Sequence, residues 1–277
     1  RASGQETQDR RCIPSKDKGM NEKSICDDSV ICGDNCEVMR HWPDECVDLV
    51  VTSPPYDDLR TYGGHEWDFY GVAWNLARLL KQGGVIVWVV ADQTKDGNET
   101  GTSMRQALHF QTLGLNLHDT MIYQAAGTGA KGSNKAYWQE WEYCFVFSRG
   151  ALATFNPLST GKATPAGRVS ERRSKDGTIR EPRFRPASVG RPGNIWRYGH
   201  VGQTGHPAPF PEKLARDHVF SWSKPGDTVL DPFAGSGTTL KAAKELERRY
   251  VGIEVNPEYV EICRRRITQE VLPLETL

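Results

Sequence analysis

The chain has 277 residues, enough for one α/β domain with an insertion, and its 35 basic and 35 acidic side chains leave no formal net charge. With no net charge, any contact with nucleic-acid phosphates must come from a local basic patch. No apolar run reaches about 18 residues, so a membrane-spanning helix is not expected.

The N-terminal region is polar and without periodicity up to residue 24, which predicts a flexible arm and no signal peptide. Three of the seven cysteines, Cys26, Cys32 and Cys36, are close enough in sequence to be compared with zinc ligands. They lack a paired Cys-x-x-Cys, and Cys32 lies in a strand-like run. An odd number of cysteines without this pairing favours a reducing, intracellular protein that has no metal site.

Strand-like apolar runs alternate with helix-like stretches along most of the chain. The expected strands are Ser29–Cys32, Val47–Thr52, Gly84–Ala91, Asp119–Gln124, Tyr143–Ser148, Thr228–Asp231 and Tyr250–Glu254. The expected helices are Asn35–His41, Tyr70–Lys81, Ser103–Leu113, Thr238–Leu246 and Pro257–Gln269. This alternation predicts an α/β fold with a mostly parallel sheet and helices on both faces.

The second expected strand, Val47–Thr52, ends abruptly in the sequence Ser53-Pro54-Pro55-Tyr56. Two prolines remove two backbone donors and fix two φ angles, which leaves a stiff loop. The carbonyl oxygens of this loop are then available to accept hydrogen bonds from a ligand. An ordinary rigid turn is the alternative for this motif taken alone.

Residues 150–205 interrupt the alternation, because they are rich in Gly, Pro, Ser and Arg. Ten basic residues against three acidic ones lie between Gly161 and Gly199, with Phe184, Trp196 and Tyr198 among them. A basic segment that carries aromatic side chains is expected where a protein contacts phosphates and bases. The alternative is a solvated loop without a ligand.

A glycine-containing loop follows the expected strand Thr228–Asp231 and carries Gly235 and Gly237 ahead of the next helix. Glycine permits positive φ and close approach of the backbone to a ligand. Glu254 ends the following strand about 20 residues after Gly235, where an acidic side chain can bind the hydroxyls of a ribose. Leu240 stands where a nicotinamide-dinucleotide loop has its third glycine, which disfavours that cofactor.

Two of these motifs carry a resemblance to a known family. The string Asp231–Thr239 (DPFAGSGTT) resembles the S-adenosylmethionine loop of the DNA amino-methyltransferases, and Ser53–Tyr56 (SPPY) resembles their catalytic motif. The order of catalytic loop, basic insertion and cofactor loop is that of the permuted beta group. Over roughly residues 29–269, the resemblance implies a seven-stranded class I methyltransferase sheet, S-adenosyl-L-methionine as cofactor and double-stranded DNA as partner.

The resemblance also implies a division of the chain into four parts. Residues 1–24 would form the N-terminal arm, 25–149 the catalytic half, 150–205 the target-recognition insertion and 206–277 the cofactor-binding half. His206–Leu214 resembles the segment that closes over the methionine end of the cofactor, with a rigid linker as the alternative. Gly33-Asp34 resembles the adenine-side contact, with a simple strand-ending turn as the alternative.

Three sets of site residues follow from the resemblance, with no metal ligand among them. The expected catalytic residues are Ser53, Pro54, Pro55 and Tyr56. The expected cofactor-binding residues are Asp34, His206, Pro207, Phe210, Pro211, Asp231, Pro232, Phe233, Gly235, Ser236, Gly237, Thr238, Glu254 and Asn256. The expected DNA-binding residues are Arg60, Arg172, Arg173, Lys175, Arg180, Arg183, Arg185, Arg191 and Arg197.

The expected target is an exocyclic amino group, whose lone pair is delocalised into the ring of the base. Two acceptors, the Ser53 hydroxyl oxygen and the Pro54 carbonyl oxygen, would hold its hydrogens and favour a pyramidal nitrogen that attacks the methyl group. Tyr56 would offer an aromatic face to a base flipped out of the duplex. Within the family, Ser rather than Asp at residue 53 favours N4 of cytosine, with N6 of adenine as the alternative.

Other functions are less favoured by particular residues. Methylation at a pyrimidine carbon is disfavoured because the chain has no Pro-Cys pair. The intact motifs disfavour a silent DNA-binding module, and Ser53 disfavours a protein-amide methyltransferase, which has Asn there; RNA stays an alternative substrate.

Two further sets of residues near the catalytic motif have no assigned role. Asp57, Asp58, Arg60 and Tyr62 could line the base pocket or form a solvated turn. Trp138, Trp141 and Glu142 could border the flipped base, with core packing as the alternative. The family further implies a homodimer and an intracellular location with the DNA, either in the bacterial cytoplasm or nucleoid or in a nucleus.

Overall fold

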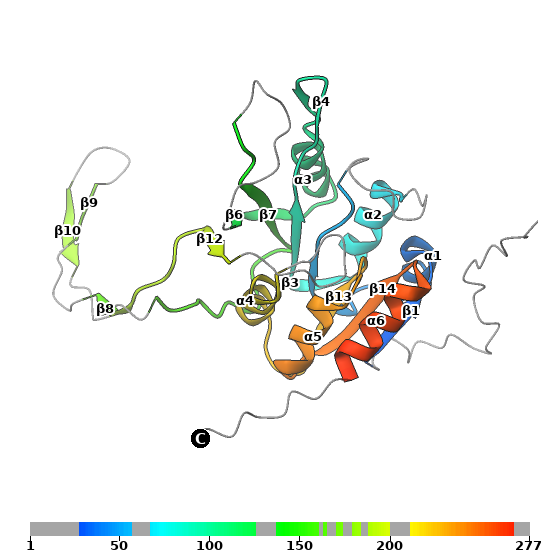
Figure 1. Cartoon of the computed structure of the whole chain (residues 1–277). Helices are drawn as coiled ribbons and strands as arrows, with labels where there is room; N and C mark the ends of the chain where they lie inside the picture. The colour runs from blue at the N-terminus through cyan, green and yellow to red at the C-terminus, as the bar shows by residue number, and fades with distance from the viewer. Residues whose placement is uncertain are drawn as a thin grey trace, which may run out of the picture.

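Eight strands form one mixed sheet whose order is β1-β14-β13-β2-β3-β7-β6-β12 (Figure 1). The computed structural model describes residues 28–56, 67–125, 137–160, 163–164, 170–173, 179–183, 188–199 and 211–268. The strands are β1 (Ser29–Cys32), β2 (Val47–Thr52), β3 (Leu80–Val90), β6 (Asn116–Ala125), β7 (Trp141–Ser148), β12 (Ile195–Tyr198), β13 (Thr228–Asp231) and β14 (Arg249–Glu254). Only β7 runs antiparallel to its neighbours in this sheet, so the expected mostly parallel α/β fold is confirmed.

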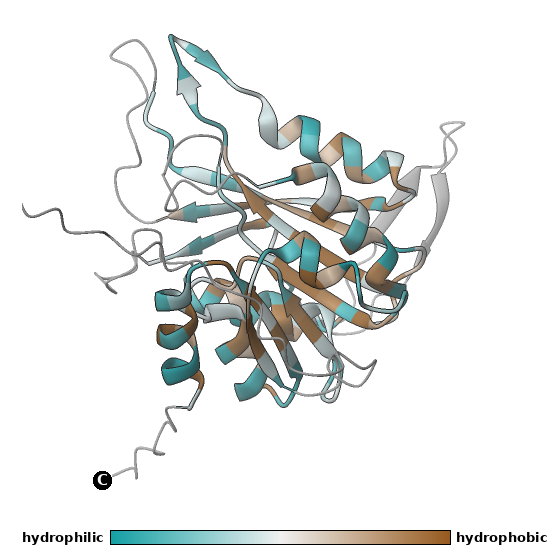
Figure 2. Ribbon diagram, turned by 90° about the vertical axis from the view of Figure 1, so that its right-hand side faces the viewer, coloured by the Kyte–Doolittle hydropathy of each residue, from teal (hydrophilic) through white to brown (hydrophobic). Residues whose placement is uncertain are grey.

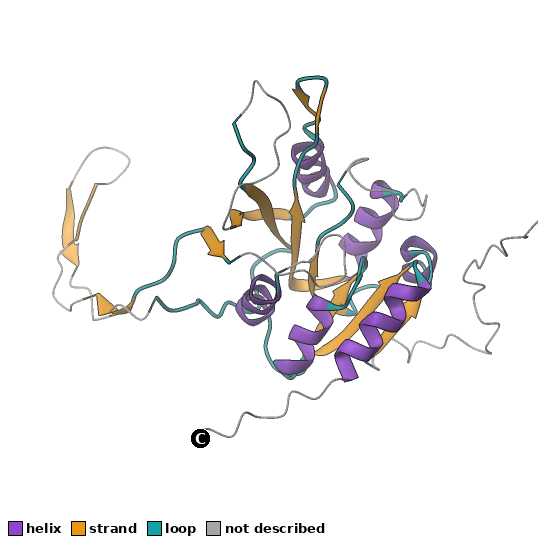
Figure 3. Ribbon diagram, in the orientation of Figure 1, coloured by secondary structure: helices purple, strands orange, loops and turns teal. Residues whose placement is uncertain are grey.

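Six described helices cover the two faces of the sheet (Figure 3). One face packs against α1 (Asn35–Met39), α2 (Phe69–Leu79) and α3 (Thr102–Thr112). The other packs against α4 (Glu212–Trp222), α5 (Thr238–Glu245) and α6 (Pro257–Thr268).

The central strands are apolar on both faces, because helices cover both sides of the sheet. Side chains of a strand point alternately to opposite faces. In β3, Ile86, Trp88 and Val90 therefore join the core under α1–α3. Val85, Val87 and Val89 join the core under α4 and α5. Figure 2 shows the resulting hydrophobic strands between the two helical layers. An unbroken apolar run is the expected pattern for a strand that is buried on both sides.

Two elements differ from the sequence expectation. The sheet has eight strands rather than seven, because β12 pairs in parallel with the edge strand β6 although it lies within residues 150–205. Its four residues include exposed Ile195 and Arg197, so the strand has no apolar run that would have predicted it. Helix α4 was also not expected, although Leu214, Ala215 and Val219 form its buried stripe. Its first residues belong to the proline-rich motif, which obscured the helical period.

Small two-stranded ladders complete the described strands. They are β4 (Thr94–Lys95) with β5 (Asn98–Glu99), β8 (Ala163–Thr164) with β11 (Ser188–Val189), and β9 (Ser170–Arg173) with β10 (Ile179–Arg183). The β9–β10 hairpin lies apart from the main sheet (Figure 1).

Most of the described cysteines carry free thiols. Cys36, Cys46, Cys144 and Cys263 are free thiols, whereas Cys32 is disulfide-bonded, which the sequence did not predict. Cys26 lies outside the described residues.

Within the described ranges, no group of three or more His, Cys, Asp or Glu side chains is placed to hold a metal ion. No helix there has the length and apolarity needed to cross a membrane.

Candidate active site

The catalytic motif and the cofactor motif lie side by side because β2 and β13 are adjacent, parallel strands. Ser53 follows the last residue of β2, and Asp231 is the last residue of β13. The next two strands outward, β14 and β1, end at Glu254 and Cys32, with Asp34 shortly after. Ligands of open α/β sheets bind at the carboxyl ends of the strands, so all these residues share one candidate site.

Buried hydrogen bonds tie the two motifs together. The Thr52 hydroxyl donates to Asp231 Oδ1 at 2.7 Å, and the Phe233 N–H donates to the same oxygen at 3.1 Å. From the far side of the loop, the Thr239 hydroxyl donates to the Val51 carbonyl at 3.2 Å. Burial raises the pKa of Asp231 from 3.8 to about 6, although its hydrogen bonds with Thr52, Phe233 and Thr239 oppose that rise. Asp231 therefore holds the cofactor loop against the catalytic strand.

The glycines of the cofactor loop adopt backbone angles that other residues disfavour. Gly235 has φ of 51° and Gly237 has φ of 82°, both in the left-handed region. A β-carbon at residue 237 would overlap Cys263 Sγ on α6. Gly237 therefore permits both the turn into α5 and the close packing of that turn against α6.

Glu254 lies where a ribose-binding carboxylate was predicted. Its Oε2 accepts from the Gly235 N–H at 2.9 Å and its Oε1 accepts from the Asn256 N–H at 2.9 Å. These two amides fix the orientation of the carboxylate, whose oxygens are acceptors of the kind that ribose hydroxyls require. Asn256 Oδ1 accepts from the Glu258 N–H at 2.9 Å in the first turn of α6, which gives Asn256 a structural role.

The remaining loop residues are anchored in the protein core. The buried Asn35 donates through Nδ2 to the Pro232 carbonyl at 3.1 Å. The Phe233 ring meets Trp67 edge-on with 5.0 Å between ring centroids, and both rings pack on the core under α1–α3. Asp34 Oδ1 caps α1 by accepting from the Glu37 N–H at 2.9 Å, and its contact with the adenine of the cofactor stays a prediction.

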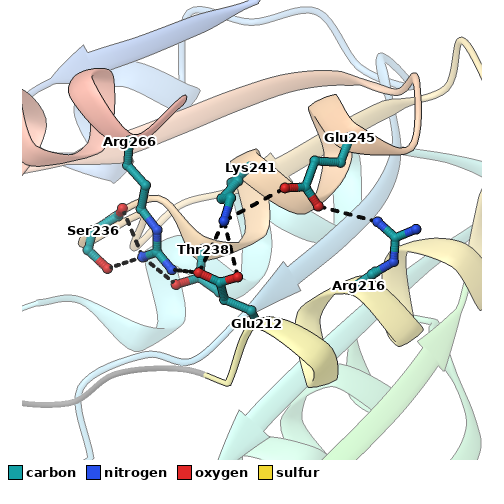
Figure 4. A network of polar contacts seen from close by, with 7 residues as sticks. All are labelled: Glu212, Arg216, Ser236, Thr238, Lys241, Glu245 and Arg266. Atoms are coloured by element: carbon teal, nitrogen blue, oxygen red, sulfur yellow. Dashed lines mark hydrogen bonds and ion pairs between the residues drawn. The ribbon is translucent and has the colours of Figure 1, made fainter. Parts of the chain in front are cut away.

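Arg266 joins the cofactor loop to two helices (Figure 4). Its guanidinium donates to Ser236 Oγ at 2.9 Å and to Thr238 Oγ1 at 3.0 Å. The same guanidinium forms an ion pair with Glu212 on α4, and Lys241 on α5 donates to Glu212 at 3.1 Å. Two hydroxyls expected to face the cofactor thus also contact an arginine.

The catalytic motif is held by a short chain of hydrogen bonds. Ser53 Oγ lies 2.8 Å from Tyr56 Oη, and Tyr56 Oη donates to Glu142 Oε2 at 2.8 Å. Pro54 is buried, and Pro55 and Tyr56 are half-buried. Burial of the hydroxyl, followed by the charge of Glu142, raises the pKa of Tyr56 well above its usual value.

The residues around the catalytic motif divide into exposed and structural ones. Trp138 and Trp141 have about half and more than a third of their surface exposed, so they are not core residues. Asp92 accepts from the Ser103 N–H at 2.9 Å and so holds the start of α3. Asp57, Asp58, Arg60 and Tyr62 lie outside the described residues.

The expected DNA-binding residues are described only in part. Arg191 is exposed, with its guanidinium 5.6 Å from the centroid of the Phe155 ring. Arg197, on β12, donates to Gln124 Oε1 on β6 at 2.8 Å. Arg172 and Arg173 lie on β9, and Arg180 and Arg183 lie on β10. Arg60, Lys175 and Arg185 lie outside the described residues, as do the cofactor candidates His206, Pro207 and Phe210. Pro211 is buried at the start of α4.

Several residues of the site were not predicted from the sequence. Thr52, Asn35 and Arg266 act through contacts with residues far away in the chain, and no local motif marks them. Glu142 was considered only as a border of the base pocket, whereas the structure joins it to Tyr56.

Comparisons with known proteins agree with this arrangement. A family model described as DNA methylase, of the N6 and N4 type, matches residues 47–265, more than half of the chain. The chain is 44% identical over 249 residues to the orphan methyltransferase M.BamHII of Bacillus amyloliquefaciens, covering 82% of this chain and 90% of that protein. It is 28% identical over 256 residues to the DNA adenine methyltransferase YhdJ of Escherichia coli strain K12, covering 86% and 82%.

Solved structures share the fold. The cytosine-N4-specific PvuII DNA methyltransferase superposes with a TM-score of 0.65 at 19% identity, covering 88% of this chain and 87% of that chain. A candidate DNA modification methylase of Thermus thermophilus, in complex with S-adenosyl-L-methionine, gives a TM-score of 0.60 at 27% identity, covering 87% and 93%. The fold is therefore that of the class I methyltransferases.

Proposed function

The chain belongs to the N6/N4 family of DNA methylases, and we propose that it transfers a methyl group to N4 of cytosine in DNA. It is a DNA methyltransferase of the restriction–modification type, and its methyl donor is S-adenosyl-L-methionine. The single observation that supports cytosine is Ser53, the first residue of the catalytic motif, beside the cofactor loop.

The cofactor loop supports this proposal through its shape and its donor set. Gly235 and Gly237 leave the backbone bare at the carboxyl end of β13. The Glu254 carboxylate would accept from the ribose hydroxyls of the donor, with its orientation fixed by the Gly235 and Asn256 amides. When bound, S-adenosyl-L-methionine supplies a methyl group on a positively charged sulfur.

The chemistry assigned to the catalytic motif is the positioning of one amino group. The Ser53 hydroxyl oxygen and the Pro54 carbonyl oxygen would accept the two hydrogens of the target amino group, which favours a pyramidal nitrogen with an available lone pair. Tyr56 would stack on the flipped base. These groups lie close to the cofactor loop because Thr52, directly before Ser53, is bonded to Asp231.

Adenine N6 is the second candidate target. The relatives include an adenine methyltransferase, and the structures include a cytosine-N4-specific one, so relationship alone does not distinguish the two bases. Ser53 favours cytosine because Asp is the commoner first residue of the motif among the adenine enzymes.

The DNA contact is proposed for the basic residues between 161 and 199, which include the exposed Arg191 and Arg197. In this proposal, residues 150–205 recognise the target sequence, residues 25–149 form the catalytic half and residues 206–277 form the cofactor-binding half. The observation that β12 joins the main sheet means that this segment is anchored at its C-terminal side. A homodimer stays a prediction.

The proposed function can be tested by producing the chain in a bacterial host whose own DNA lacks both modified bases. Genomic DNA is digested to nucleosides and the methylated ones are quantified by mass spectrometry. N4-methylcytosine, at a strongly reduced level when the Ser53→Ala variant is produced in the same amount, is the expected result. N6-methyladenine alone would replace cytosine by adenine as the target.

A further inference from the structure

The hydrogen-bond chain that starts at Ser53 crosses the end of β3 and reaches Glu142 on β7. Its two links, Ser53 Oγ to Tyr56 Oη and Tyr56 Oη to Glu142 Oε2, are both 2.8 Å long. Both distances are normal for bonds between oxygen atoms. The chain connects the catalytic serine to a carboxylate 89 residues later in the sequence.

The hydrogens in this chain can point in only one direction. A tyrosine hydroxyl has a single hydrogen, and Tyr56 donates its hydrogen to Glu142. The Tyr56 oxygen therefore accepts the hydrogen of Ser53. Among the described residues, no hydrogen bond is donated to the Ser53 oxygen, so its lone pairs face no described donor there and can accept from an amino group.

We propose that Glu142 positions the Ser53 hydroxyl as an acceptor and takes up, through Tyr56, the proton that the target amino group loses. This inference rests on the proposed role of Ser53. It assigns to Glu142 a function in the reaction that none of the sequence motifs suggests.

The proton transfer balances in atoms and charge. The amino nitrogen forms a bond to the methyl carbon with its lone pair, while the carbon–sulfur bond breaks and leaves its electron pair on sulfur. The nitrogen now carries one proton in excess, which moves to Ser53 Oγ. The Ser53 hydrogen moves to Tyr56 Oη and the Tyr56 hydrogen to Glu142. The positive charge of the sulfonium and the negative charge of Glu142 are both gone at the end.

The groups around Glu142 favour it as the final acceptor. Tyr123 lies opposite Glu142 on β6, and Cys144 lies two residues further along β7. Burial and the charge of Glu142 raise the pKa of Tyr123 to about 12, and the same causes raise the pKa of Cys144 above its usual range. Both groups are therefore neutral at pH 7. Burial, and then the charges of Asp92 and Glu99, raise the pKa of the neighbouring Tyr143.

A Glu142→Gln variant separates the reaction role from a structural one. The amide oxygen of glutamine still accepts from Tyr56, but it does not take up a proton. With saturating donor and DNA, we expect the single-turnover rate to fall by about 100-fold, and the decline of the rate toward low pH to be lost. Glu140→Gln, the same change two residues earlier at an exposed site, should keep the wild-type rate and pH profile.

A Tyr56→Phe variant interrupts the chain at its middle link. Because residues that act as one unit are not additive, the double variant with Glu142→Gln should be no slower than the slower single variant. If the double variant lost rate by the product of the two single fold-losses, Tyr56 and Glu142 would act independently, and this would contradict one connected chain of hydrogen bonds. If Glu142→Gln failed to fold, Tyr56→Phe alone would still test the chain through the same pH profile.

The apo protein provides a readout that does not depend on turnover. Burial is the largest cause that raises the pKa of Tyr56, and the charge of Glu142 and its hydrogen bond raise it further, so the Tyr56 ring signal in NMR should titrate at lower pH in Glu142→Gln. Wild-type rate and pH profile in Glu142→Gln would overturn the inference while leaving the proposed function intact. Full activity of Ser53→Ala would remove the assigned role of Ser53, whereas methylation of adenine alone by the wild type would overturn the proposed function.

Discussion

At the scale of single residues, the site depends on side chains that connect two loops. Ser53 lies next to Thr52, which is bonded to Asp231 at the end of the neighbouring strand. The motifs in the sequence identified Ser53 and Asp231, but they did not predict the hydrogen bond from Thr52 to Asp231 that joins β2 to β13. Such a bond joins residues 179 apart in the chain, so only the packing of the strands reveals it.

Replacement of Ser53 tests the assigned acceptor. Ser53→Ala should leave the calorimetric affinity for S-adenosyl-L-methionine close to that of the wild type, because no contact between Ser53 and the cofactor loop is assigned. Turnover should fall by about 100-fold or more, since one preorganised hydrogen-bonding group is lost from the transition state. Ser53→Thr keeps a hydroxyl and serves as the control. Equal turnover of Ser53→Ala and wild type would remove the role of the hydroxyl.

Asp231 gives a prediction about the dependence of stability on pH. Its folded pKa of about 6 lies above its ordinary value of 3.8, so the folded protein binds this proton more tightly than the unfolded chain. Stability from this group is therefore present below pH 4 and is lost as pH rises to about 7, at a cost of about 3 kcal/mol.

Asp231→Asn removes this titration while an amide oxygen can still accept from Thr52 and Phe233. We expect the apo variant to be more stable than wild type in urea at pH 8 and to show a flatter pH dependence between pH 4 and 7. Parallel pH curves for the two proteins would show that the Asp231 carboxyl does not titrate in that range.

At the scale of elements, the cofactor loop is fixed by the packing of α5 against α6. Gly237 combines a left-handed backbone with contact against Cys263, and Gly226 has nearly the same φ, 84°, but open space around it. The two glycines therefore separate backbone strain from crowding.

Gly237→Ala should destabilise the protein by about 3 kcal/mol, from left-handed strain and overpacking together, and weaken donor binding. Gly226→Ala should cost only about 1–2 kcal/mol, from strain alone, with donor affinity unchanged. Adding Cys263→Ala to Gly237→Ala removes the crowding sulfur and should restore part of the loss. Urea unfolding and calorimetry measure both quantities, and equal costs for the two glycines would contradict the packing argument.

The sequence predicted the elements well where local signals were strong. The strands β2 and β13 are apolar runs that end at a clear motif, and their bounds agree with the expectation. Helix α4 and strand β12 were missed because the proline-rich motif and the basic composition dominate those stretches. The contacts of Arg266 and Glu142 were also missed, because each depends on elements that approach only in the folded sheet.

At the scale of the whole molecule, a chain without net charge must bind DNA through a local surplus of basic residues. This surplus lies between residues 161 and 199. The amino ends of the parallel strands β13 and β14 lie at the opposite end of the strands from the candidate site, so basic residues there serve as a control. Equal changes of charge can be made in the basic segment and at these amino ends, and their effects on DNA binding can be compared.

Charge reversal of Arg183 and Arg185 should weaken DNA binding and reduce the slope of log affinity against log salt concentration, since fewer counterions are released. Reversal of Lys224 and Arg249, beside the starts of β13 and β14, changes the total charge equally and should leave that slope unchanged. Binding isotherms at several salt concentrations measure it. A wild-type slope in the first variant would move the DNA contact to another surface.

The most direct test of cytosine as the target is to identify the base that the purified chain methylates. The protein is incubated with mixed-sequence duplex DNA and methyl-labelled S-adenosyl-L-methionine, and the product is digested to nucleosides for mass spectrometry. Label is expected in N4-methylcytosine. Label in N6-methyladenine would contradict the assignment of cytosine to Ser53, and an absence of labelled base despite measured donor binding would contradict the proposed activity on DNA.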